Sequence, residues 1–176
     1  MTYAAMDIAN YIVKKSIELK RPISNLRLQK LLYYIQARFL VETGEPLFCD
    51  EIGKWKYGPV IPSVYHEFKK YGSGTIDSIS EQLLVERNKN GDIVDISVKH
   101  FNEDDIDLKV RGKIEETVNS LSKYGTFDLV HKTHEQSLWK QYEHAIINNS
   151  FVEPYTDEEI KQYFSDHPEV RIWENK

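Results

Sequence analysis

One amphipathic stretch, residues 28–39, most narrowly limits what this chain can fold into. Its apolar side chains recur at intervals of three and four residues, and they are Leu28, Leu31, Leu32, Ile35 and Phe39. That spacing lines one face of an α-helix. Gly44 and Pro46 predict its end, because glycine suits a left-handed cap and proline cannot continue the hydrogen-bond ladder. The stretch therefore predicts a long helix with an apolar face.

The segment that follows combines turn residues with aromatic rings. Residues 55–57 predict a short extended piece, and Gly58-Pro59 predicts a turn that restarts a helix at Val60. The rings gathered around this segment are Tyr33, Tyr34, Phe39, Phe48, Trp55, Tyr57, Tyr65, Phe68 and Tyr71. Such rings either fill a core or form a recognition surface, and their spacing leaves both interpretations open.

The remaining chain predicts further helices and one β-hairpin. The helical segments are 3–20, 102–124, 126–135, 137–147 and 156–167. Their expected caps are Ser24 or Asn25 for the long helix, then Thr126 and Thr156. Residues 83–98 alternate as two strands around Asn90-Gly91, which is a hairpin signal.

These elements predict a mainly α fold. We expect one compact helical domain over residues 1–176, with a small β-hairpin of two or three short strands inserted at 83–98. Trp55 and Lys56 would supply the third strand, because an isolated hairpin is only marginally stable. The C-terminal helix and tail occupy 156–176, and we expect the tail after Pro168 to be loosely held.

Composition narrows the class of protein. The net charge is −5, with 23 basic and 28 acidic side chains, which argues against a nucleic-acid partner. The single cysteine, Cys49, excludes an internal disulfide framework and fits a reducing cytoplasm. No apolar run approaches the length of a membrane span, and the N-terminus lacks the layout of a signal peptide.

Motifs for catalysis are missing from the sequence. It contains no glycine-rich phosphate loop, nucleophile elbow or Cys/His pair. His131 and His134, with Glu135, could share a helix face, but the further metal ligands lack motif spacing. We therefore expect no enzyme activity, no catalytic residue, no cofactor and no metal site. A helix-turn-helix with Arg27, Gln29 and Lys30 in a major groove is an alternative hypothesis.

Several runs of residues also carry a family resemblance. They are Asn-Leu-x-Leu-Gln-Lys-Leu-Leu-Tyr-Tyr from residue 25, Thr-Gly-Glu-Pro-Leu-Phe from 43, Trp-Lys-Tyr-Gly-Pro-Val-x-Pro-x-Val-Tyr from 55 and Phe-Lys-Lys-Tyr-Gly from 68. Together with Tyr-Gly at 124, Thr-His at 133 and Trp139, they resemble the Panacea domain over residues 5–165. That domain is the antitoxin part of many bacterial and phage toxin–antitoxin pairs, and it includes SocA-type proteolytic adaptors.

The resemblance implies an antitoxin that neutralises a cognate protein toxin encoded nearby, by direct protein–protein contact. The resemblance also implies a second mode of action, in which the protein delivers the toxin to an ATP-dependent protease. The alternative function is that of a DNA-binding phage or prophage regulator. The motif residues, expected to build the scaffold or to contact the partner, are Gln29, Lys30, Tyr33, Tyr34, Trp55, Lys56, Tyr57, Gly58, Pro59, Tyr65, Thr133, His134 and Trp139. Residues 29–33 would pack on 55–59, and 133–139 would close that centre from the other half.

Overall fold

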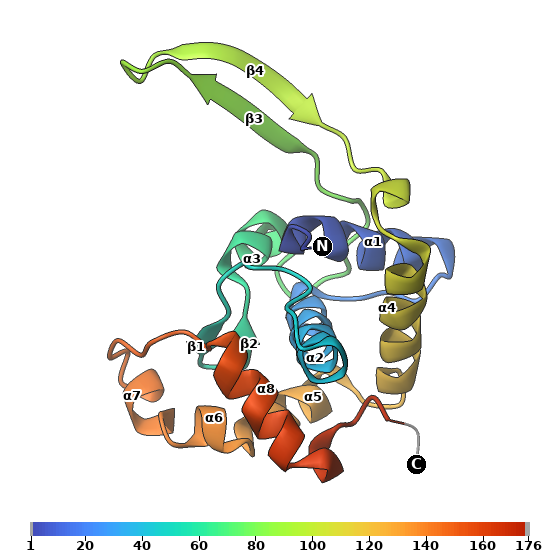
Figure 1. Cartoon of the computed structure of the whole chain (residues 1–176), viewed down its shortest axis with the longest axis vertical. Helices are drawn as coiled ribbons and strands as arrows, with labels where there is room; N and C mark the ends of the chain where they lie inside the picture. Colours follow the sequence, from blue (N-terminus) through green and yellow to red (C-terminus); the bar gives the residue numbers. More distant parts are fainter. Residues whose placement is uncertain (1, 175–176) are drawn as a thin grey trace.

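The computed structural model describes residues 2–174 and places one long helix, α2 (Asn25–Thr43), at the centre of the molecule (Figure 1). The longer helices packed around it are α1 (Ala5–Glu18), α3 (Pro62–Phe68), α4 (Leu108–Leu121), α5 (Thr126–His134) and α8 (Asp157–Asp166). The predicted mainly α fold with small β-hairpins is confirmed. In α1, Met6, Ala9, Ile12 and Val13 are buried, whereas Ile17 is 43% exposed.

Local signals set both ends of α2. The Ser24 hydroxyl accepts a hydrogen bond from the Arg27 backbone N–H at 3.3 Å, which confirms the predicted cap. Gly44 takes the left-handed conformation, with φ +81°, at the other end. Between these caps burial extends well beyond the apolar stripe, because Gln29, Lys30 and Gln36 are also buried. Neighbours therefore surround α2.

The segment after α2 differs from the prediction. β1 (Gly53–Trp55) pairs antiparallel with β2 (Gly58–Val60), so Gly58-Pro59 lies in a strand and does not start a helix. Gly58, the first residue of β2, takes φ +91°, a left-handed backbone conformation that favours glycine. Proline is tolerated at position 59 because both strands of a two-stranded sheet are edges. Helix α3 begins only at Pro62 and continues into a 3-10 turn, Lys69–Tyr71.

The second hairpin forms where the sequence predicts it. β3 (Gln82–Arg87) pairs antiparallel with β4 (Ile93–Lys99), and Gly91 supplies a positive φ of +88° at the turn. The hairpin extends away from the helices (Figure 1). Its predicted third strand is wrong, because the strand that contains Trp55 pairs with β2.

Two predicted helix starts shift in the structure. The acidic run before α4 forms a separate 3-10 turn, Glu103–Asp105, and Asp107 caps the helix by accepting from the Lys109 N–H at 2.8 Å. Glu103 of this turn pairs with Lys14 of α1 at 2.9 Å. At α5 the cap is Gly125, not Thr126, since the Asp128 carboxylate accepts from the Gly125 N–H at 2.8 Å.

The predicted helix over 137–147 is broken into α6 (Ser137–Lys140) and α7 (Glu143–Ile147). Trp139 is buried, whereas Tyr142 is 38% exposed and its ring lies 5.0 Å from the Lys54 ammonium. A continuous helix would have to satisfy both contacts with one face. The break lets the two rings reach different neighbours.

The C-terminal region confirms one prediction and corrects another. Thr156 and Glu159 form the predicted capping box of α8, with the Glu159 N–H donating to the Thr156 hydroxyl at 3.1 Å. The tail beyond the 3-10 turn Pro168–Val170 is not loosely held, because Trp173 is only 3% exposed. Its ring centroid lies 5.1 Å from that of Phe164. Residues 175–176 lie outside the described part of the chain.

Across residues 2–174, none of the helices combines the length and hydropathy that crossing a membrane requires.

Candidate functional site

Gln29 and its neighbour Asn25 join α2 to the segment after β2. The Gln29 amide oxygen accepts a hydrogen bond from the Ile61 N–H at 2.9 Å, and its amide nitrogen donates to Asn25 Oδ1 at 2.9 Å. Asn25 in turn donates to the Tyr65 carbonyl at 3.0 Å. Gln29 is fully buried, so these bonds replace the water that its amide has lost. The two side chains hold the start of α3 against α2.

Lys30 makes the second contact between α2 and the β1–β2 hairpin. Its ammonium donates to the Pro59 carbonyl at 2.8 Å, and the side chain is completely buried. Burial lowers the pKa of Lys30 to about 7, because removal from water disfavours the charged form. A buried amine with this pKa exchanges its proton near neutral pH.

β2 approaches Lys30 so closely that only glycine fits at position 58. A Cβ on Gly58 would lie 2.5 Å from Thr133 Oγ1 and 3.1 Å from Lys30 Nζ. Thr133 belongs to α5 and donates to the Val130 carbonyl at 2.7 Å. Three elements from distant parts of the chain, α2, β2 and α5, therefore meet at one glycine.

Two tyrosines of α2 share one partner from the second half of the chain. The Tyr33 hydroxyl donates to Gln136 Oε1 at 2.6 Å, and Gln136 Nε2 donates to the Tyr34 hydroxyl at 3.4 Å. Burial raises the pKa of both phenols. Both hydroxyls are therefore neutral in the folded protein and act as hydrogen-bonding groups inside the core.

His134 and Trp139 close the centre on the side of α5 and α6. Their rings stack with centroids 3.8 Å apart and planes inclined by 14°. The Trp139 indole N–H donates to the Trp55 carbonyl at 2.8 Å, which ties α6 to β1. Burial lowers the pKa of His134, and the nearby Lys30 charge lowers it further, whereas a hydrogen bond with the Lys56 backbone opposes both effects. The histidine is thus held as a neutral ring.

Comparison with known proteins bears on the same residues. The profile described as "Antitoxin SocA-like, Panacea domain" matches residues 28–140, which include the α2 motif, the β1–β2 hairpin and the α5–α6 pair. The chain belongs to the SocA-like Panacea-domain family. It is 48% identical over 68 residues to Antitoxin SocA of Caulobacter vibrioides (strain NA1000 / CB15N). That alignment covers 39% of this chain and 36% of the relative. No solved structure matches the chain.

The Panacea motif residues divide into an interior group and a surface group. Gln29, Lys30, Tyr33, Tyr34, Gly58, Pro59, Thr133, His134 and Trp139 converge on the centre described above. Lys56 and Tyr57 form the exposed β1–β2 turn, with Tyr57 52% exposed. Trp55 and Tyr65 are half-buried beneath that turn, with ring centroids 5.1 Å apart.

The burial of α2 overturns the helix-turn-helix hypothesis. Gln29 and Lys30, which would have to face a DNA groove, have no exposed surface. Arg27 is engaged in the protein, because its guanidinium donates to the Tyr124 carbonyl at 2.8 Å and to the Leu121 carbonyl at 3.2 Å. The predicted recognition helix is therefore the central core helix of the Panacea domain.

Sequence reasoning missed several buried polar residues of this domain. Gln136 bridges the two tyrosines, and Gln36 accepts from the Leu47 N–H at 3.0 Å. Lys54 is 7% exposed, pairs with Glu159 at 3.0 Å and donates to the Pro154 carbonyl at 3.1 Å. A signal existed for Gln36, because it follows Gln29 by seven residues and thus shares its helix face. Gln136 and Lys54 have no comparable local signal.

His131 and His134, which the sequence places on one helix turn, lie in different surroundings. His131 is exposed, whereas His134 is stacked on Trp139. Over residues 2–174, no group of three or more His, Cys, Asp or Glu side chains is arranged to hold a metal ion.

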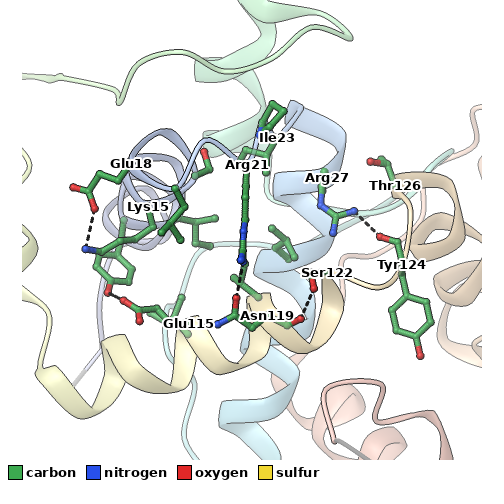
Figure 2. Close-up of a pocket in the computed structure, with 18 of the residues that line it drawn as sticks. Lys15, Glu18, Arg21, Ile23, Arg27, Glu115, Asn119, Ser122, Tyr124 and Thr126 are labelled. Carbon is green, nitrogen blue, oxygen red and sulfur yellow. Dashed lines mark hydrogen bonds and ion pairs between the residues drawn. The ribbon is translucent and has the colours of Figure 1, made fainter.

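A cleft of about 700 Å³ lies between α1, the start of α2 and α4 (Figure 2). Apolar residues such as Ile23 and Leu31 line it, and Arg21, Arg27 and Glu115 add charged groups. These groups are already engaged: Arg21 donates to Asn119 Oδ1 at 3.0 Å, and Glu115 accepts from the Tyr11 hydroxyl. These two contacts are made within the protein, so they already occupy Arg21 and Glu115.

Proposed function

We propose that this protein is the antitoxin of a bacterial or prophage toxin–antitoxin pair, and that it neutralises a cognate toxin encoded nearby by direct protein–protein contact. Membership of the SocA-like antitoxin family over residues 28–140 is the observation that carries this proposal. We further propose that residues 1–176 act as one domain in the cytoplasm and that the role is non-catalytic.

The position of the Panacea motif supports a scaffold role for most of its residues. Gln29, Lys30 and Tyr33 are fully buried, so a partner cannot reach them without unfolding the centre. Recognition of the toxin then falls to exposed side chains. Of the motif residues, Lys56 and Tyr57 on the β1–β2 turn remain available for contact.

The deciding experiment is bacterial growth while the adjacent open reading frame is induced, with and without this protein. Growth arrest on induction alone, relieved by co-expression, supports the antitoxin function. A harmless neighbour, or one that stays toxic although this protein is soluble, contradicts it. Lys109→Met, at an exposed position of α4, is a matched control that should protect as well as the wild type.

The same cells distinguish two modes of neutralisation, direct binding and delivery to a protease. Direct binding leaves the toxin level unchanged and lets the two proteins co-purify. Delivery to an ATP-dependent protease shortens the half-life of the toxin, and deletion of the protease restores toxicity. Measurement of toxin half-life after translation arrest distinguishes them.

A further inference from the structure

The hairpin of β3 and β4, residues 82–99, forms an arm that stands away from the helical body (Figure 1). Leu83 lies opposite Val98, and Val85 lies opposite Ile96. Since side chains alternate across a sheet, these four residues share one surface. The members of this apolar face are 43% to 69% exposed, and they are Leu83, Val85, Ile96 and Val98. The face has no cover from the body.

The opposite face of the arm, the mixed face, carries both apolar and acidic groups. Leu84 is 47% exposed on it. Glu86 lies directly opposite Asp95 across the strands. Like charges in that position destabilise a strand pair. Within residues 2–174, neither carboxylate makes an ion pair or accepts a hydrogen bond.

An arm with these properties is unfavourable when it stands alone. A two-stranded hairpin is only marginally stable in water, and both of its edges present unpaired backbone groups. Contiguous exposed apolar side chains mark surfaces that bind other proteins. The exposed apolar side chains, the unpaired strand edges and the opposed carboxylates therefore all indicate that another protein binds the arm.

We propose that the arm is the surface that docks the toxin. The partner would offer an apolar strip to the apolar face and a lysine or arginine side chain to Glu86 and Asp95. This inference rests on the proposed antitoxin function, and it adds which part of the chain makes the contact.

Charge complementarity favours a foreign protein over a second copy of this chain. The arm's own cations are Arg87, Lys89 and Lys99. Arg87 donates to the Gly91 carbonyl at 2.8 Å, and Lys99 pairs with Asp7 of α1 at 2.8 Å. Of the three cations, a second arm would therefore bring only Lys89 free of such contacts within residues 2–174, against the two carboxylates Glu86 and Asp95. A second arm packed on the apolar face would also leave Leu84 and both carboxylates uncovered. A partner that supplies a cation covers both faces.

The test measures binding of the full-length protein to the product of the adjacent reading frame, made by cell-free translation. A triple variant, Leu83→Thr, Val85→Thr and Ile96→Thr, removes apolar surface while threonine keeps the preference for a strand. We expect its affinity to fall by about tenfold or more, with loss of growth protection. The control is Phe151→Thr, which truncates a side chain that is 82% exposed away from the arm, and its affinity should be unchanged.

A second variant, Glu86→Gln with Asp95→Asn, gives a readout that a purely structural role would not produce. Removing the like-charge repulsion should raise the melting temperature of the free protein, while binding weakens and loses much of its salt dependence. Stability and affinity thus move in opposite directions.

Each outcome has a separate meaning. If the wild type binds and protects but both arm variants bind equally well, the arm inference is wrong and the antitoxin function stands. If the wild type itself neither binds nor protects, the antitoxin function is wrong and the arm inference falls with it. If the triple variant only converts a dimer into a monomer, with affinity for the neighbour unchanged, the arm joins copies of this chain and the inference is overturned.

Discussion

The indole N–H of Trp139 donates a 2.8 Å hydrogen bond to the main-chain carbonyl of Trp55, across 84 residues of sequence. This bond joins the β1–β2 hairpin to the α5–α6 pair, and thereby links the two halves of the Panacea motif. The same indole stacks on His134. Substitution of Trp139 therefore tests how much the contact between the two halves contributes to stability.

Trp139→Phe should destabilise the fold by about 1–2 kcal/mol, because it keeps a ring but leaves the Trp55 carbonyl without its donor. Trp139→Ala should cost about 3–5 kcal/mol, since it also empties a buried volume. Urea unfolding followed by circular dichroism measures both. Equal stability of Trp139→Phe and wild type would show that the bond contributes nothing.

Gly58→Ala should cost about 2–4 kcal/mol, because a Cβ there overlaps Thr133 Oγ1 and alanine disfavours a φ of +91°. Gly91→Ala is the matched control: its φ is +88°, but no atom lies within 4 Å, so it should lose only the backbone part. Thr133→Ala combined with Gly58→Ala should recover part of the loss. Thermal denaturation of the wild type, the single variants Gly58→Ala, Thr133→Ala and Gly91→Ala, and the double variant checks this, and strict additivity would contradict the overlap.

Lys30 predicts that stability rises with pH above neutrality. Its pKa falls from 10.5 to about 7 on folding, so between these values the unfolded chain binds a proton that the folded protein lacks. Below pH 7 the free energy of unfolding is reduced by the whole cost of burying the Lys30 charge, and this reduction disappears as the pH rises toward 10.5. The slope contributed by Lys30 should approach about 1.4 kcal/mol per pH unit within the window.

The measurement is the difference in unfolding free energy between wild type and Lys30→Met from pH 6 to pH 9. Lys30→Met should flatten the rise, because methionine does not titrate. Lys109→Met, at an exposed position, should follow the wild-type curve. Parallel curves for wild type and Lys30→Met would refute the shifted pKa.

Trp173→Ala should destabilise the protein by about 3–5 kcal/mol, although it lies only three residues from the end of the chain. Its ring packs at 5.1 Å from Phe164 and 6.3 Å from Tyr34, between α8 and α2. Hydrogen exchange of the α8 amides should accelerate along with the loss of stability. Unchanged protection of α8 would mean that the tail is dispensable.

Several elements could be predicted from the sequence because their causes are local. The ends of α2 depend on Ser24 and Gly44, each within a few residues of the backbone groups that it serves. The capping box of Thr156 and Glu159 and the β3–β4 turn at Gly91 are equally short-range. In each case one residue type determines the local conformation.

Other features were decided only by tertiary structure. Gly58-Pro59 reads as a turn before a helix, yet it is a strand, because the carbonyl of Pro59 accepts from buried Lys30 of α2 and the segment pairs with β1. The sequence after Pro168 predicts a loosely held tail, yet the Trp173 ring packs between α8 and α2.

Local patterns thus predict most of the helices, the caps at Ser24 and Thr156 and the β3–β4 hairpin, since periodicity and capping act over one or two turns. Tertiary structure decided which polar groups would be buried and where they would find partners. Gln136, for example, reaches Tyr33 and Tyr34 across about a hundred residues of chain. Such pairings depend on how whole elements pack together, and no local pattern of residue types records them.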